Sequence, residues 1–117
     1  MALRKFVEKL TKPVEEQDRE QLVSWCDLSG ATPIDQVELR HPVRIAGEVR
    51  SVRIVPRAGA DALEAIVGDG RSWVTAVFLG RRKIAGMSPG RRLLLEGVVT
   101  KDRQLGRVMY NPVYTLV

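Results

Sequence analysis

The fold of this chain follows from one stretch, Val43-Arg44-Ile45-Ala46-Gly47-Glu48-Val49-Arg50. Its apolar and small residues recur with a period of two, which predicts a β-strand with one face turned toward a core. The strand is expected to continue to about residue 54 after a bend near Ser51. Gly47 in the middle of a strand indicates strong coiling or the close approach of a neighbouring element.

Four further strands are predicted downstream, because apolar runs alternate there with turn residues. They span about residues 62–68, 72–79, 91–100 and 107–116. Residues 80–90 leave room for one or two helical turns between the third and fourth strands. Five strands with a helical insert at that place follow the order of an OB-fold, a small, partly open Greek-key barrel. The predicted fold class is therefore mainly β, with residues 36–117 as the OB-fold domain.

A helical period precedes this domain. Leu3, Phe6, Val7 and Leu10 lie on one stripe of a short helix predicted over residues 3–11. A second helix is predicted over residues 14–25, after Pro13, with acidic residues in its first turns. Residues 1–35 are thus expected to form a short N-terminal α-helical hairpin. This hairpin either packs on the barrel or binds a protein partner.

Charge is distributed unequally between these two parts. Residues 1–42 contain 6 Lys and Arg against 8 Asp and Glu, whereas residues 43–117 contain 13 against 6. A small basic β domain with arginines in its turns attracts polyanions such as a phosphate backbone. The charge pattern therefore points to nucleic acid as the partner.

Two further observations concern the compartment. The single cysteine, Cys26, has no partner for an internal disulfide and is expected to be a small buried hydrophobe. No segment reaches the ~18 apolar residues of a membrane span, and the N-terminus lacks the apolar core of a signal peptide. We therefore expect a cytoplasmic protein without membrane contact.

Several segments, taken in order, resemble a known family. They are Val43-Arg44-Ile45-Ala46-Gly47-Glu48-Val49, Gly68-Asp69-Gly70, Val77-Phe78-Leu79, Pro89-Gly90-Arg91-Arg92-Leu93-Leu94-Leu95-Glu96-Gly97 and Asn111-Pro112-Val113-Tyr114. Together they resemble the tRNA-anticodon-type OB-folds, and most of all the wedge-type OB domain of RecG helicases. The layout is also similar to small stand-alone actinobacterial OB-fold nucleic-acid-binding proteins. The resemblance implies binding of single-stranded or branched DNA, with RNA as the alternative.

The chain departs from that family in two respects. It has no G-x-x-x-x-G-K-[ST] phosphate loop and is too short for motor domains. Wedge domains carry two adjacent aromatics at the end of the third strand, whereas the pair here is Phe78-Leu79. Alternation places Phe78 inward, so Leu79 occupies the outward position at which a base would stack.

Candidate binding residues follow from the same alternation. Trp73 is predicted on the outer face of the third strand, where its ring either stacks on a base or lies beneath the helical hairpin, covered by Leu22 or Trp25. Arginines in and beside the turns are expected to contact backbone phosphates rather than bases. The expected nucleic-acid-binding residues are Arg44, Arg50, Arg53, Arg57, Trp73, Leu79, Arg81, Arg82, Lys83, Arg103 and Arg107.

The sequence offers little for catalysis. His41 is the only histidine and precedes a proline, and without a second His or Cys there is no zinc set. Asp69 and Asp102 are expected in turns, where Asp bonds to local backbone. We therefore expect a non-enzymatic binding module without a cofactor or metal. The rival interpretation is a protein-interaction adaptor that uses the acidic hairpin and the barrel edge.

Overall fold

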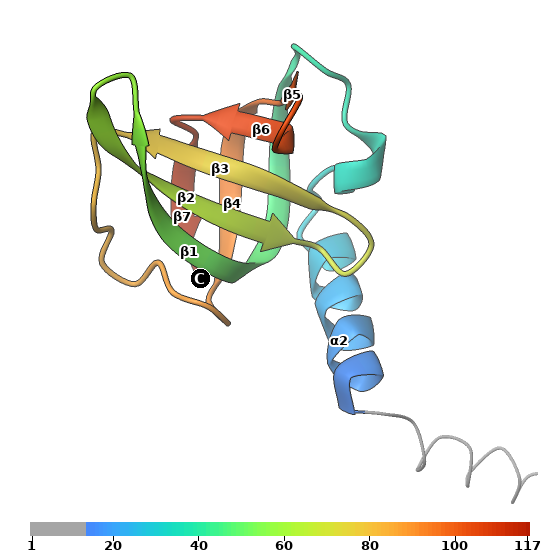
Figure 1. The fold of residues 1–117 in the computed structure, drawn as a ribbon. Helices are drawn as coiled ribbons and strands as arrows, with labels where there is room; N and C mark the ends of the chain where they lie inside the picture. Colours follow the sequence, from blue (N-terminus) through green and yellow to red (C-terminus); the bar gives the residue numbers. More distant parts are fainter. Residues whose placement is uncertain (1–13) are drawn as a thin grey trace, which may run out of the picture.

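The computed structural model describes residues 14–117, which form one α-helix, one 3-10 turn and seven strands (Figure 1). The elements are α2 (Val14–Leu28), η1 (Ile34–Gln36), β1 (Pro42–Arg57), β2 (Ala60–Gly68), β3 (Trp73–Leu79), β4 (Arg92–Val98), β5 (Thr100–Asp102), β6 (Gly106–Tyr110) and β7 (Val113–Leu116). The mainly β class is confirmed, and so is the helix expected over residues 14–25. The helix expected over residues 3–11, and with it the hairpin, lies outside the described residues.

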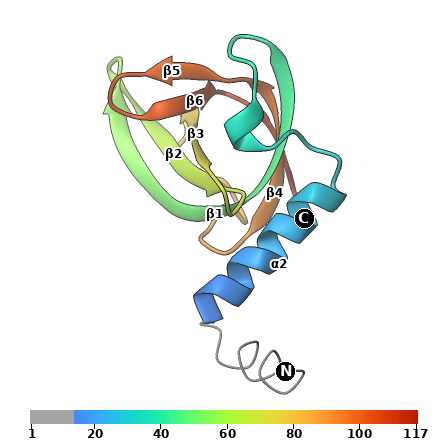
Figure 2. The same cartoon turned by 90° about the vertical axis from the view of Figure 1, so that its right-hand side faces the viewer.

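All seven strands belong to one sheet with the order β5-β6-β3-β2-β1-β4-β7. Neighbouring strands are antiparallel except β3 and β6, which are parallel. β5 and β7 are the two edges, so hydrogen bonding among residues 14–117 leaves the sheet open rather than closing a barrel. Figure 2 shows how strongly the strands curl around the core nonetheless.

The expected count of five strands is wrong for two local reasons. The strand predicted over residues 91–100 is divided at Val99, whose carbonyl accepts a hydrogen bond from the Arg40 N–H at 2.9 Å instead of continuing the ladder. The strand predicted over residues 107–116 is divided at Asn111, which has a φ of 49°, and at Pro112, which has no N–H to donate. The strand predicted over residues 107–116 is therefore present as β6 and β7, whereas the one predicted over residues 91–100 is β4, followed by the additional short strand β5.

The helical insert expected within residues 80–90 is also wrong, because this segment contains turns and no helix. Gly80, Gly86 and Gly90 have φ values of 74°, 80° and 91°, which a right-handed helix does not accommodate. The segment instead sends Ile84 and Met87 into the core, where they are 4% and 6% exposed. The segment therefore contributes apolar side chains to the core.

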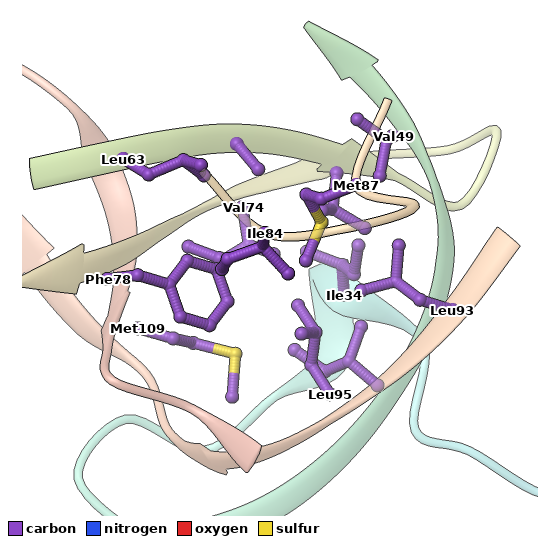
Figure 3. Close-up of a cluster of buried hydrophobic side chains, with 14 of the residues drawn as sticks. Ile34, Val49, Leu63, Val74, Phe78, Ile84, Met87, Leu93, Leu95 and Met109 are labelled. Atoms are coloured by element: carbon purple, nitrogen blue, oxygen red, sulfur yellow. The ribbon is translucent and has the colours of Figure 1, made fainter. Parts of the chain in front are cut away.

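The core lies inside the curl of the sheet (Figure 3). Ile45 and Val49 from β1, Val74 and Phe78 from β3, and Leu93 from β4 all point into it, as alternation predicts. Phe78 meets Tyr114 edge to face, with the ring centroids 5.6 Å apart. Ile34 of η1 is fully buried in the same cluster, although its segment has the composition of a loop.

Two features of β1 let it pair with both β2 and β4. The register shifts between Val49 and Ser51, which is the bend predicted near Ser51. A Cβ on Gly47 would lie 2.6 Å from Val67 Cγ1 and 2.8 Å from the Gly68 carbonyl oxygen. The predicted close approach of a neighbouring element to Gly47 is therefore confirmed, since β2 lies against it. No larger residue fits at this position without a shift of β2.

Candidate nucleic-acid interface

The outer face of β3 carries the residues that alternation placed there. Trp73 and Leu79, at the two ends of the strand, are 51% and 46% exposed, whereas Val77 between them is fully buried. Val77 packs with Ala62, Val108 and Leu105, which come from β2, β6 and the turn before β6. Alternation predicts that all outward side chains of β3 are exposed. In the structure the middle of this face is buried and only its two ends are exposed to solvent.

Trp73 is not covered by the helix in the part of the chain that the structure describes. Leu22 and Cys26 pack on Ala46 of β1, and Trp25 and Leu94 of β4 pack against the same cluster. α2 therefore crosses the outer face of β1 and β4, and the alternative in which Leu22 or Trp25 covers Trp73 is wrong. The indole lies beside the β5–β6 turn, since a Cβ on Gly106 would be 3.6 Å from its Cη2 atom.

A groove of about 670 Å³ lies between the N-terminal half of α2 and the outer face of the sheet, and Trp73 forms part of its wall. Leu22 and Ile66 add further apolar surface. Four arginines also line the groove: Arg19, Arg50, Arg71 and Arg92. Three carboxylates accompany them, namely Glu15, Asp18 and Glu48. The groove thus combines an accessible aromatic ring with a small excess of positive charge.

α2 lies beside the β2–β3 turn (Figure 1), and polar contacts join the two. Arg71 binds Asp27 through two hydrogen bonds of 2.9 and 3.0 Å, and Arg19 Nε donates to the Gly70 carbonyl at 2.6 Å. The bonds from Arg71 lower the pKa of the Asp27 carboxyl. On the other side of the groove, the Arg92 guanidinium lies 5.2 Å from the centre of the Trp25 ring.

Asp69 organises the β2–β3 turn from a buried position. Its Oδ1 accepts hydrogen bonds from the Arg71 and Ser72 N–H groups, and its Oδ2 accepts one from the Ile34 N–H, each at 2.9 Å. Asp102 caps the β5–β6 turn in the same way, by accepting from the N–H groups of Gln104 and Leu105. The local backbone bonding predicted for both aspartates is confirmed.

The central part of the face contains a cluster of charged residues. Glu64 of β2 is only 2% exposed, and its Oε1 accepts hydrogen bonds from Arg53 Nε at 3.1 Å and Nη2 at 2.9 Å. Arg57 Nε donates to Glu64 Oε2 at 2.8 Å, and this bond raises the pKa of the Arg57 guanidinium. Arg57 also lies over the Tyr110 ring, 5.9 Å from its centre. The cluster carries two positive charges and one negative charge.

Arg44 lies apart from this face. It pairs with Glu96 across β1 and β4, with Nη2 2.6 Å from Oε1. Since α2 crosses β1 at Ala46, the helix separates Arg44 from Arg50. Arg50 faces the groove and lies 3.4 Å from Glu48 Oε1.

The remaining candidates lie at the two ends of the face, in loops or, for Arg107, at the start of β6. Arg82 pairs with Asp61 at 2.8 Å, which places the basic run of Arg81, Arg82 and Lys83 beside the Leu79 end. Arg107 Nη1 donates to Ser72 Oγ at 2.8 Å, beside Trp73. Arg103 is exposed in the β5–β6 turn. Within residues 14–117, neither Arg81, Lys83 nor Arg103 forms an ion pair.

Sequence reasoning missed several residues of this surface. Arg19, Arg71 and Arg92 line the groove, but they come from a helix, a turn and an inner strand that only folding brings together. Glu64 was hidden because a buried carboxylate and an exposed one look alike in a sequence. One signal was available: Glu64 interrupts the apolar run of residues 62–67, so either it is paired or the strand has a polar face there.

Three features that bear on metal, membrane and thiol chemistry can be read from the described residues. His41 is exposed, and its Nδ1 lies 3.0 Å from the Leu39 carbonyl oxygen. No group of three or more His, Cys, Asp or Glu in residues 14–117 has a geometry that would hold a metal ion. Nor does that part of the chain contain a helix with the length and apolar character needed to cross a membrane. Burial raises the pKa of the Cys26 thiol to about 11, as expected for a small buried hydrophobe.

Comparison with known proteins found no matching family model, no similar curated protein and no similar solved structure.

Proposed function

We propose that this protein binds single-stranded or branched nucleic acid on the outer face of β1, β2 and β3, with Trp73 as the stacking platform. One observation carries the proposal: a half-exposed tryptophan forms the wall of a groove that four arginines also line. Aromatic rings that accept bases, set beside cations that accept phosphates, are the general means of binding a single strand. No catalytic step is part of the proposed function.

The connectivity of the strands supports an OB-fold interpretation. β1 pairs with both β2 and β4, and β3 runs parallel to β6. β4 leads into β5 after one residue and β6 into β7 after two, so each pair acts as one interrupted strand. Counted in this way, the order is that of a five-stranded, partly open Greek-key barrel, as in the RecG wedge domain that the sequence resembles. That comparison concerns the fold and does not by itself assign a function.

The proposed path of the strand follows the order of cations along β1. It starts in the groove at Trp73 and Arg50, passes Arg53 and Arg57, and ends near Leu79 and the basic run of residues 81–83. Contacts along this path are to phosphates and to the face of one base. We therefore expect little sequence preference and a strong dependence on salt.

The direct test is a titration of the protein with fluorescent single-stranded and forked DNA at about 50 and 200 mM salt. The chain has two tryptophans, so the variant Trp25→Phe is used to assign the emission to Trp73. Binding that quenches this emission and weakens steeply with salt is the expected result. Absence of binding at micromolar protein in low salt overturns the proposal.

Arg44→Gln is the matched control in this titration. It removes one positive charge from β1, like Arg50→Gln, but from the far side of α2. We expect Arg50→Gln to weaken binding more than Arg44→Gln. Equal losses would mean that overall charge, rather than this face, determines the affinity.

The rival function is a protein-interaction adaptor that uses the acidic N-terminal helix and the sheet edge. The two functions differ in what they require of Trp73 and Leu79, since a covered platform would favour the adaptor. Both side chains are about half exposed, which favours nucleic acid.

A further inference from the structure

Glu64 is the only acidic residue within residues 14–117 that is buried on the proposed binding face. A carboxylate removed from water costs free energy unless other groups compensate its charge and satisfy its oxygens. Here both compensating groups are arginines of β1, which leave one positive charge in excess. The cluster is thus a pair of cations held in fixed positions by a buried anion.

Each arginine of the cluster retains hydrogen-bonding capacity for a second acceptor. A guanidinium is a flat fork with five N–H donors on more than one edge. Arg53 uses its Nε and Nη2 edge for Glu64, and its side chain is still 61% exposed. Arg57 uses its Nε for Glu64, is held against the Tyr110 ring, and is 25% exposed.

From this geometry we infer that Glu64 is a positioning residue, which fixes Arg53 and Arg57 as a clamp for one phosphodiester group of the bound strand. This inference rests on the proposed function and gives it a defined phosphate subsite. A phosphodiester carries one negative charge, which matches the single excess positive charge of the cluster. Its two free oxygens suit the paired N–H donors of a guanidinium.

The clamp lies next to the groove. Ile66, which lines the groove, and Glu64 are successive outward residues of β2, so they lie roughly 7 Å apart along the strand. Trp73 is opposite Gly68, four residues from Glu64, so a strand whose base stacks on Trp73 reaches the clamp with a phosphate roughly 13 Å farther along the face. Along the face, the bound strand therefore first stacks a base on Trp73 and then places a phosphate in the clamp.

The test compares two substitutions that change charge equally. Glu64→Gln and Glu96→Gln each remove one negative charge from an arginine-paired carboxylate, but Glu96 lies on β4, beyond α2. If charge alone mattered, both variants would bind an oligothymidylate of about 12 nucleotides more tightly. We expect Glu96→Gln to bind as well as the unmodified protein or better, and Glu64→Gln to bind roughly tenfold more weakly. That loss corresponds to one charge-assisted hydrogen bond, because a glutamine amide does not accept from both arginines.

A measurement on the unmodified protein removes any dependence on the stability of the variant. The Nε–H signals of Arg53 and Arg57 are followed by NMR during titration with the same oligothymidylate. Movement of both signals, with those of Arg44 unchanged, supports the clamp. Binding without such movement, or tighter binding by Glu64→Gln, overturns the clamp and leaves the proposed function standing. Absence of any binding overturns both.

Discussion

Single residues on the outer face differ because of their neighbours rather than their positions in the strand. Trp73 and Val77 both point outward from β3, yet one is half exposed and the other fully buried. Val77 has Ala62, Val108 and Leu105 around it, whereas Trp73 adjoins the groove and Gly106. The open position holds the residue with the largest flat ring, which is the side chain best suited to stack on a base.

Trp73→Ala is therefore expected to weaken binding of single-stranded DNA by about 1–3 kcal/mol, or roughly 5- to 150-fold. Stability should change little, because half of the side chain is already exposed. Fluorescence anisotropy with a labelled oligothymidylate measures the affinity, and thermal unfolding checks the fold. Val113→Ala is the control, since it also shortens an exposed apolar side chain but lies on β7. A similar loss in both variants would contradict the stacking role.

A second prediction at the scale of single residues concerns Cys26. Its thiol has a pKa of about 11 in the folded chain, against an ordinary value of 9.0, chiefly because it is buried. Between these two values the unfolded chain releases the proton while the folded chain keeps it, so the free energy of unfolding falls as pH rises. Urea unfolding between about pH 8 and pH 11 should therefore show a steeper decline for the unmodified protein than for Cys26→Ala. Parallel declines would contradict the prediction.

At the scale of elements, α2 and the β2–β3 turn form one unit. The turn approaches the helix so closely that a Cβ on Gly70 would lie 2.6 Å from Val23 Cγ2 and 3.2 Å from the Arg19 carbonyl oxygen. The Arg71–Asp27 ion pair lies on the same contact. The width of the groove, and hence the setting of Trp73, depends on this contact.

Gly70→Ala is expected to destabilise the protein more than Gly59→Ala. Both glycines have a positive φ, 92° and 79°, so both substitutions incur the strain of a left-handed alanine. Gly59 has nothing within 4 Å of a Cβ, whereas Gly70 meets α2, so Gly70→Ala should cost roughly 1–3 kcal/mol more. Urea unfolding curves of the two variants give the difference. Equal losses in the free energy of unfolding would show that α2 shifts to accommodate the added methyl group without destabilising the protein.

At the scale of the whole molecule, folding distributes the excess positive charge after residue 42 unevenly over the surface. The cations along the proposed path are Arg50, Arg53, Arg57 and Arg107, whereas the other arginines of the groove, Arg19, Arg71 and Arg92, already contact Gly70, Asp27 and Trp25. The run of residues 81–83 lies at the far end of the path, and Arg44 lies beyond α2. We therefore expect fewer phosphate contacts than the number of arginines in the sequence would allow.

If four phosphates are neutralised, the logarithm of the binding constant should fall with the logarithm of salt concentration with a slope of about −3. Affinity for oligothymidylate then drops about 50-fold between about 50 and 200 mM salt. Arg53→Gln should make the slope shallower by about 0.7, and Arg44→Gln should leave it unchanged. Anisotropy titrations at several salt concentrations provide the slopes. A slope near zero would exclude phosphate contacts as the source of affinity.

The sequence by itself determined the mainly β class, the helix before the sheet, the long bent β1 and the inward and outward faces of β3. These properties depend on period-two alternation, turn residues and glycine, which act over a few neighbouring positions. Alternation also placed Trp73 and Leu79 outward, and both are exposed. The prediction of a helical insert was wrong because it relied on the length of the segment, whereas three of its glycines have a positive φ that a right-handed helix excludes.

Only the tertiary structure decided which residues meet. The crossing of α2 at Ala46 separates Arg44 from Arg50, and the β2–β3 turn brings Arg71 to Asp27, which lies 44 positions earlier. The buried Glu64 becomes recognisable only when Arg53 and Arg57 of β1 lie opposite it. Pairing of this kind depends on the register and curvature of the sheet, which long-range packing sets and local sequence patterns do not encode.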